Sequence, residues 1–335
     1  MTRVPMLIVA GAFCAALAAS PAPAVAEGKK MVIAAPGIPP IFASVILYVA
    51  EKQGFFKKYG VDAEVRPFDT GTAASRAVIS GDIEMSLSPS ALLINQISNA
   101  DANTVAIYGL TTSDFILGSS DPAKTSCKDL VGQPIGVDTV GGARSIALRT
   151  MLTGGCPGMK IEDVQQVALS SNVAPAMIAG RLIFGVLHLD DVSVLQAQGK
   201  KIAKLLTEQK ANPNGHYLAF VVRVDKLKEN RDAYVRLMAA LIEAARFIRD
   251  PKNADKVAEA AAPTGHDKAI AKATIQPLID IDYWPFANDG LDRKRLESLI
   301  GVMKKIGGIK ADKEPVTYDR LVDESVWRDA KALVK

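Results

Sequence analysis

Five short polar turns in this sequence carry residues that could hold a small ligand. They cover residues 35–40, 69–72, 88–90, 139–145 and 170–172, and each stands between a predicted strand and a predicted helix. Ser and Thr hydroxyls donate hydrogen bonds, and Gly lets a ligand approach the backbone amides of a helix N-terminus, which favour anions. The alternative for each Ser or Thr is ordinary capping of the helix that follows it.

The turns are expected to face one cleft, because ligands of open α/β sheets bind beyond the carboxyl ends of the strands. Aromatic side chains near this cleft, Phe115 and Tyr217 among them, could stack on a ring of the ligand. The predicted ligand-binding residues are Ile38, Pro39, Phe42, Thr70, Gly71, Thr72, Ser88, Ser90, Ser113, Thr139, Gly141, Gly142, Arg144, Ser145, Ser171, Asn172, His188 and Asp190.

Arg144 is the most informative charge in these turns. It lies in the first turn of a predicted helix, where a guanidinium could pair with a carboxylate or a sulfonate through two parallel hydrogen bonds. The alternative is a solvated surface arginine. Arg76 is placed one turn inside its helix, on the outer face, and is left out of the site. Arg144 therefore favours a small organic anion as the ligand.

A second group of polar residues points to a different ligand. His188 ends a predicted strand and could bind the ligand or the hinge, whereas Asp190 is interpreted first as the cap of the next helix. If Asp114 and Asp190 both faced the cleft, an amine or an aminopyrimidine would fit better than an anion. The sequence leaves both ligand classes open.

The sequence gives little support for catalysis, metal binding or nucleic-acid binding. The three histidines are scattered without Cys or Glu at zinc-ligand spacing, and the sequence has no G-x-S-x-G, P-loop or G-x-G-x-x-G motif. A formal net charge of +4 without a dense basic stripe argues against binding to nucleic acid. We therefore predict no catalytic residue, metal or cofactor.

The N-terminus predicts export. Arg3 precedes an apolar run over residues 6–19, and Ala24-Val25-Ala26 matches the small-x-small pattern of signal peptidase sites, so residues 1–26 are predicted to be a signal peptide. No later stretch approaches the roughly 20 apolar residues of a membrane span. The mature chain is expected in the periplasm.

Strand and helix signals alternate along the mature chain, which predicts largely parallel sheets covered by helices on both faces. The first series runs to about residue 108 and includes a helix expected over 41–58 and strands over 61–67 and 104–108, and a second series restarts after Asp121-Pro122. Beyond residue 222 the chain is expected to be helical, with an apolar face from Tyr234 to Ile248 that is interpreted as core. Extended segments at 115–118 and 217–222 flank the second series as a two-strand hinge. The predicted domains are a first lobe over 27–115, a second lobe over 116–218, and completion of the first lobe with C-terminal helices over 219–335.

Cys127 and Cys156 are the two cysteines of the mature chain. In an oxidising compartment they could be a disulfide or two buried thiols. Cys127 precedes a predicted strand and Cys156 follows the next helix, so the chain returns to the same sheet edge and the two residues could meet. A bond closing a loop of roughly 30 residues would stabilise the fold by about 3 to 4 kcal/mol.

Three segments carry a resemblance to a known family. Residues 50–62 (AEKQGFFKKYGVD), 77–84 (AVISGDIE) and 129–137 (DLVGQPIGV) resemble, in register, motifs of the nitrate/sulfonate/taurine substrate-binding proteins, relatives of the thiamine-pyrimidine synthases. The resemblance implies a two-lobed periplasmic binding protein of type II with two doubly wound α/β sheets. The sequence departs from the family at Ile183, where an Asp is common.

The resemblance implies a monomer that delivers a small organic anion, either a sulfonate or a carboxylate, aromatic ones included, to an ABC permease and ATPase complex. The alternatives are binding of an aminopyrimidine or vitamin precursor, a sensory subunit, and an enzyme like the thiamine-pyrimidine synthases. The enzyme is disfavoured because the cysteine-rich motif of those synthases is missing from the sequence.

Overall fold

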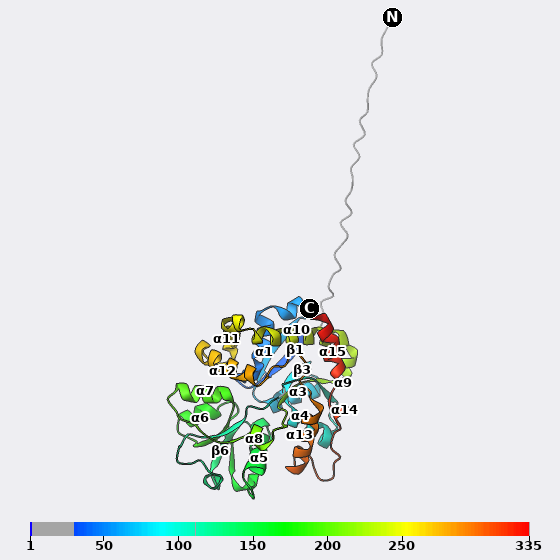
Figure 1. The fold of residues 1–335 in the computed structure, drawn as a ribbon. Helices are drawn as coiled ribbons and strands as arrows, with labels where there is room; N and C mark the ends of the chain where they lie inside the picture. Colours follow the sequence, from blue (N-terminus) through cyan, green and yellow to red (C-terminus); the bar gives the residue numbers. More distant parts are fainter. Residues whose placement is uncertain (2–29, 111, 335) are drawn as a thin grey trace.

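The fold is seen in a computed structural model that describes residues 30–110 and 112–334, together with Met1. The predicted signal peptide lies outside the described residues, apart from Met1. Two five-stranded sheets organise the chain into two lobes (Figure 1). The first lobe is built on the sheet that contains the first strand, and the second lobe on the sheet formed by residues 116–207.

The first sheet has the strand order β2-β1-β3-β10-β4 and is parallel except for β10. Alternate residues of β10 face opposite sides: Leu218, Phe220 and Val222 join the core under one helical layer, and Ala219 and Val221 join the core under the other. The strands are β1 (Met31–Pro36), β2 (Ala63–Phe68), β3 (Met85–Pro89), β4 (Thr104–Leu110) and β10 (Leu218–Arg223).

The second sheet has the order β7-β6-β8-β5-β9, with β5 antiparallel to both of its neighbours. Its edge strand β9 was not predicted, because its half-exposed residues and Lys204 give only a weak apolar pattern. The strands are β5 (Ile116–Ser119), β6 (Pro134–Val137), β7 (Gln165–Ala168), β8 (Phe184–Leu187) and β9 (Ala203–Thr207).

The helices of the first lobe before residue 111 follow the predicted pattern with one correction. A single helix was expected over residues 41–58, but the structure breaks it at Gly54, whose φ of 72° favours glycine. The segments are the 3₁₀ turn η1 (Phe42–Ser44), α1 (Val45–Lys52), α2 (Phe55–Lys58), α3 (Gly71–Ser80) and α4 (Ser90–Ala100).

The C-terminal helices complete the first lobe. The predicted apolar face of α10, from Tyr234 to Ile248, is buried and packs against α1, as expected for a core stripe. Trp284 Nε1 donates a hydrogen bond to Ala43 O at 3.1 Å, which fixes the C-terminal segment on the first lobe. The helices are α9 (Val224–Glu229), α10 (Arg231–Arg249), α11 (Ala254–Ala260), α12 (Lys268–Asp280), α13 (Arg293–Lys305), α14 (Tyr318–Leu321) and α15 (Glu324–Leu333), with the 3₁₀ turns η4 (Pro251–Asn253) and η5 (Ala262–Thr264).

The second lobe places its helices around its own sheet, with α12 of the first lobe lying over α7 (Figure 1). The predicted disulfide is confirmed: Cys127 and Cys156 are bonded, with their Cα atoms 5.7 Å apart. The segments are η2 (Cys127–Leu130), α5 (Ala143–Gly155), η3 (Ile161–Asp163), α6 (Val173–Ile178), α7 (Leu189–Ala197) and α8 (Glu208–Ala211).

Two crossings join the lobes, one between β4 and β5 and one from β9 through α8 to β10. The strands that follow them, β5 and β10, are the antiparallel strands of their sheets. The expected hinge strands therefore exist, each starting one residue later than predicted. Within the described parts of the chain, no helix combines the length and apolar character that a membrane span requires. The exact lobe boundaries stay a prediction.

Candidate functional site

All five predicted turns meet around one cavity between the lobes. The first lobe contributes turn residues that follow β1, β2 and β3, and the second lobe contributes those that follow β6 and β7, because the carboxyl ends of both sets of strands point to the interface. The cavity is lined by Pro36, Gly37, Ile41, Asp69, Thr70, Gly71, Pro89, Asp138, Ala143, Arg144, Ser170, Ser171, His188, Tyr217 and Leu218.

The lobes are closed on each other across this cavity. Ser170 Oγ donates to Asp69 at 2.8 Å, and Ser171 Oγ donates to Ile38 O at 2.7 Å. The cavity volume is about 30 Å³, which holds one or two water molecules. Entry of an organic ligand therefore requires the lobes to separate.

Asp138 occupies the helix end that was predicted to attract an anion. Its carboxylate accepts hydrogen bonds from the backbone amides of Ala143 at 3.0 Å and Arg144 at 3.1 Å, the first residues of α5. Burial raises the pKa of Asp138 above its usual value. The amide of Gly141 is also used, because it donates to Ser145 Oγ at 2.9 Å. The N-terminus of α5 thus presents a carboxylate to the cavity.

Arg144 is buried, with 4% of its surface exposed, and pairs with Asp191. Its Nη1 lies 2.7 Å from Asp191 Oδ2 and donates to Val186 O at 2.5 Å. The surface-arginine alternative is therefore wrong. Arg76, by contrast, is exposed as predicted. Arg144 lines the cavity, but Asp191 already balances its charge.

His188 links the second lobe to both crossings. Its Nδ1 lies 2.9 Å from Asp114 Oδ1, and its Nε2 lies 3.2 Å from Tyr217 Oη. Burial by itself lowers the pKa of His188, but the Asp114 carboxylate outweighs it and the pKa is raised. Asp114 also accepts the backbone N–H of Leu189 at 3.1 Å. The hinge and the start of α7 therefore share one polar network.

The expected capping role of Asp190 is wrong. Asp191 fills that role, since its carboxylate accepts the backbone N–H of His188 at 2.9 Å at the start of α7. Asp190 faces the first lobe instead. Both Asp114 and Asp190 line a small void beside His188, with Phe42 and Tyr283 among its walls. Neither carboxylate lines the cavity where the five turns meet, so the condition under which an amine-bearing ligand was expected is not met there.

The other predicted residues have varied surroundings. Thr70 caps α3 through Ala73 N and lines the cavity beside Gly71. Phe42 packs on the His266 ring. Five more predicted residues form hydrogen bonds to other groups of the protein. The pairs are Ser88 with Ser86, Ser90 with His216, Ser113 with Glu208, Ser145 with Gln166, and Gly142 with Thr139 O.

Several predicted residues lie at the edge of the site. Ile38, Pro39, Gly141 and Asn172 are exposed. The hydroxyls of Thr72 and Thr139 are buried and have no hydrogen-bond partner among the described residues.

Sequence reasoning missed Asp69, Asp138 and Ser170 as individual site residues. Asp138 stands directly after β6 and Ser170 two residues after β7, positions that the carboxyl-end rule already marks. Asp69 and Ser170 were interpreted only as parts of their turns, and Asp138 lay one residue outside the predicted turn over 139–145. The signal that could have found Asp138 is a carboxylate placed just before a glycine-rich helix start.

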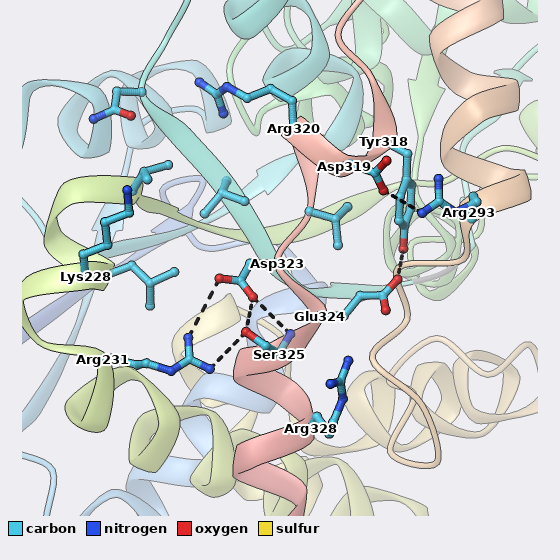
Figure 2. Close-up of a pocket in the computed structure, with 15 residues that line it drawn as sticks. Lys228, Arg231, Arg293, Tyr318, Asp319, Arg320, Asp323, Glu324, Ser325 and Arg328 are labelled. Carbon is cyan, nitrogen blue, oxygen red and sulfur yellow. Dashed lines mark hydrogen bonds and ion pairs between the residues drawn. The ribbon is translucent and has the colours of Figure 1, made fainter.

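Larger hollows lie away from the lobe interface. One of about 590 Å³ opens between α9, α14 and α15 on the first lobe (Figure 2). Three of its four arginines are engaged: Arg231 pairs with Asp329, Arg293 pairs with Asp319, and Arg320 donates to the carbonyls of Ala102 and Thr104. These contacts hold the C-terminal helices together, so this hollow is not taken as the ligand site. Among the described residues, no cluster of His, Cys, Asp and Glu is placed to hold a metal.

Comparison with known families identifies the chain. Residues 42–254 match the family described as NMT1/THI5 like. The chain belongs to this family. A Brucella abortus protein named as a candidate binding protein is 26% identical over 228 residues, which cover 67% of this chain and 69% of that protein. The family and the two-lobed geometry agree with the resemblance found in the three sequence motifs.

Solved structures share the fold of this NMT1/THI5-like chain. The ligand-binding component of an ABC-type import system from Staphylococcus aureus has a TM-score of 0.71 at 12% identity, covering 90% of this chain and 98% of its own. The alkanesulfonate-binding protein SsuA from Xanthomonas axonopodis has a TM-score of 0.67 at 16% identity, with coverages of 90% and 98%. The desulfurization enzyme DszB also has this fold (0.64, 15%, 91% and 99%).

Proposed function

We propose that this protein is the periplasmic solute-binding component of an ABC importer, which captures a small organic molecule between its lobes and presents it to a permease and ATPase complex. The observation that carries the proposal is the convergence of five turns from two sheets on one cavity, with two crossings that let the lobes rotate. Closure is favoured only by the difference in ligand affinity between the open and closed states.

The ligand class follows from the charges around the cavity. Asp138 occupies the start of α5, Asp114 accepts the first amide of α7, and Asp191 balances Arg144. A ligand that donates hydrogen bonds can use the Asp138 carboxylate without displacing a protein group, and the Tyr217 side chain in the cavity wall suits a ring. The geometry therefore favours an amine-bearing ring such as an aminopyrimidine.

A small organic anion is the second candidate, and Arg144 is the observation that favours it. Arg144 lines the cavity, and a sulfonate or carboxylate could accept hydrogen bonds from N–H groups along one edge of its planar guanidinium. Such a ligand would have to compete with Asp191 or share the guanidinium with it. The sulfonate specificity of SsuA supports this candidate by analogy of fold alone.

An enzyme is the third candidate, and the cysteines argue against the synthase type. The two described cysteines, Cys127 and Cys156, are joined to each other on the second lobe, so neither is available as a thiolate ligand. A monomeric state and delivery to a permease rather than to a sensory receptor remain parts of the proposal.

A thermal-shift screen of residues 27–335 tests the proposal, because a ligand that binds the native state raises the melting temperature. The probes are aminopyrimidines, riboflavin, aliphatic sulfonates, aromatic carboxylates and nitrate. A shift with aminopyrimidines that is lost in Asp138→Asn, and kept in the matched surface variant Asp129→Asn, supports the favoured ligand class. A shift only with anions that is lost in Arg144→Ala supports the second. No saturable binding of any class by protein freed of ligand through refolding would contradict the proposal for these ligands.

A further inference from the structure

Asp190 and His266 meet across the interface between the lobes. Asp190 belongs to α7 of the second lobe, and His266 lies in the turn before α12 of the first lobe, which packs over α7 (Figure 1). Asp190 Oδ2 is 3.3 Å from His266 Nε2, and each side chain is only 10% exposed. The contact is therefore a shielded ion pair that exists only while these surfaces touch.

The hydrogen bonds of His266 determine where its protons are. Its Nδ1 lies 2.9 Å from the carbonyl oxygen of Thr264, which can only accept, so Nδ1 carries a hydrogen. A neutral imidazole has one N–H, and Nε2 would then turn a lone pair towards the Asp190 carboxylate. An imidazolium donates from both nitrogens and removes this conflict. The Phe42 ring, 5.4 Å away and edge-on, holds the imidazole in this orientation.

The charged groups around His266 leave Asp190 as its partner. On α7, Asp191 is committed to Arg144, which also lies close enough to act on Asp190. His188, which lines the same small void as Asp190, is paired with Asp114. At the start of α12, Asp267 caps Ile270 N, and Lys268 pairs with Glu259 of α11 and with Asp255. Protonation of His266 is therefore balanced mainly by Asp190.

We propose that His266 is a positioning residue for lobe closure, whose imidazolium holds Asp190 of the opposite lobe and releases it when the proton is lost. The inference rests on the proposed function, in which capture of a ligand depends on closure. In the open state His266 is hydrated and titrates near its usual value of about 6.5.

The closed state changes that titration. Burial lowers the pKa of His266, but the hydrogen bond and charge of Asp190 outweigh it, so the pKa is raised. Each pKa unit between the two states changes the ratio of closed to open molecules tenfold. Because the closed state holds the proton more tightly, its advantage is present below the open-state pKa and is lost as pH rises through the closed-state pKa.

Small-angle X-ray scattering of the mature protein without ligand tests this inference at about pH 5.5 and about pH 8, on either side of the usual histidine pKa. The wild type is expected to have the larger radius of gyration at the higher pH. His266→Ala and Asp190→Asn break the contact from opposite lobes and should be expanded at both values. Lys268→Gln, two residues from His266 but outside the contact, should keep the wild-type response.

An identical radius of the wild type at both pH values would overturn the inference, as would a wild-type pH response in both contact variants. Circular dichroism checks that each variant is folded, and two variants on different lobes guard against the misfolding of one. The measurement uses no ligand. Failure of the ligand screen would therefore count against the proposed function while leaving the scattering result interpretable.

Discussion

Arg144 Nη1 lies 2.7 Å from Asp191 Oδ2, and this pair joins the first turn of α5 to the first turn of α7 inside the second lobe. The arginine also donates to Val186 O in β8. The Arg144 guanidinium thus connects the starts of α5 and α7 to the central strand β8. These contacts stabilise the second lobe in the absence of a ligand.

Arg144→Ala is therefore expected to destabilise the protein by about 3 to 5 kcal/mol, because it leaves the buried carboxylate of Asp191 without its partner. Urea unfolding measures the loss, and the exposed Arg76→Ala should stay within about 0.5 kcal/mol of the wild type. If Arg144 also binds the ligand, affinity falls by a further 1.5 to 3 kcal/mol or so. A stability change no larger than that of Arg76→Ala would show that the pair contributes little.

Asp138→Asn separates the two ligand classes. The substitution keeps the size of the side chain and removes its charge, so affinity for an amine-bearing ligand should fall by about 10- to 100-fold, equivalent to roughly 1.5 to 3 kcal/mol. Affinity for an anion should rise instead, because a repulsive carboxylate is gone. Isothermal titration calorimetry with the best ligand from the screen measures both, and Asp129→Asn, a capping residue on the outer surface, serves as the matched control.

Ser170→Ala and Ser171→Ala remove hydrogen bonds between the lobes. The double variant should bind its ligand about 5- to 30-fold more weakly, since each exposed hydrogen bond contributes about 0.5 to 1 kcal/mol to the closed state. The urea midpoint of the unliganded protein should change little. Ser80→Ala removes an exposed hydrogen bond within the first lobe and should leave the dissociation constant unchanged. Unaltered affinity in the double variant would show that these contacts do not stabilise the liganded state.

The bond between Cys127 and Cys156 closes a loop with a sequence separation of 29. Replacing both cysteines by serine should lower the free energy of unfolding by about 3 to 4 kcal/mol in the chain-entropy model. Thermal unfolding measures this loss, and mass spectrometry of the protein purified without reductant checks the bond directly. Two free thiols in that protein would contradict the structure.

Glu208 gives the protein a pH dependence of stability. The residue is buried at the second crossing and accepts a hydrogen bond from Ser113 Oγ at 2.5 Å; burial raises the pKa of Glu208 to about 7. Between about pH 4.5 and 7 the folded state holds a proton that the unfolded state has lost, so stability from this group falls as pH rises through that window and then levels off. Urea unfolding should show a flatter profile in Glu208→Gln than in the wild type. Parallel profiles would exclude this role.

The sequence by itself determined most of the order of strands and helices, the edge strand β9 excepted, because apolar periodicity reports burial locally. Alternation placed β2 and β4 within a few residues, and the stripe on α10 was confirmed as core. The carboxyl-end rule brought five turns to one cavity. Cys127 and Cys156 could be paired in advance because a strand and the following helix return the chain to one sheet edge.

Only the tertiary structure decided which charges are available to a ligand. Arg144 and Asp191 are 47 residues apart in the sequence, and His266 and Asp190 are 76 residues apart. No local sequence pattern therefore predicts that the members of either pair are in contact. A helix start that looked open to an anion holds Asp138 instead. Ion pairing depends on distances set by the packing of whole lobes. The sequence therefore predicted where the cleft lies, and the fold decided what charge it presents.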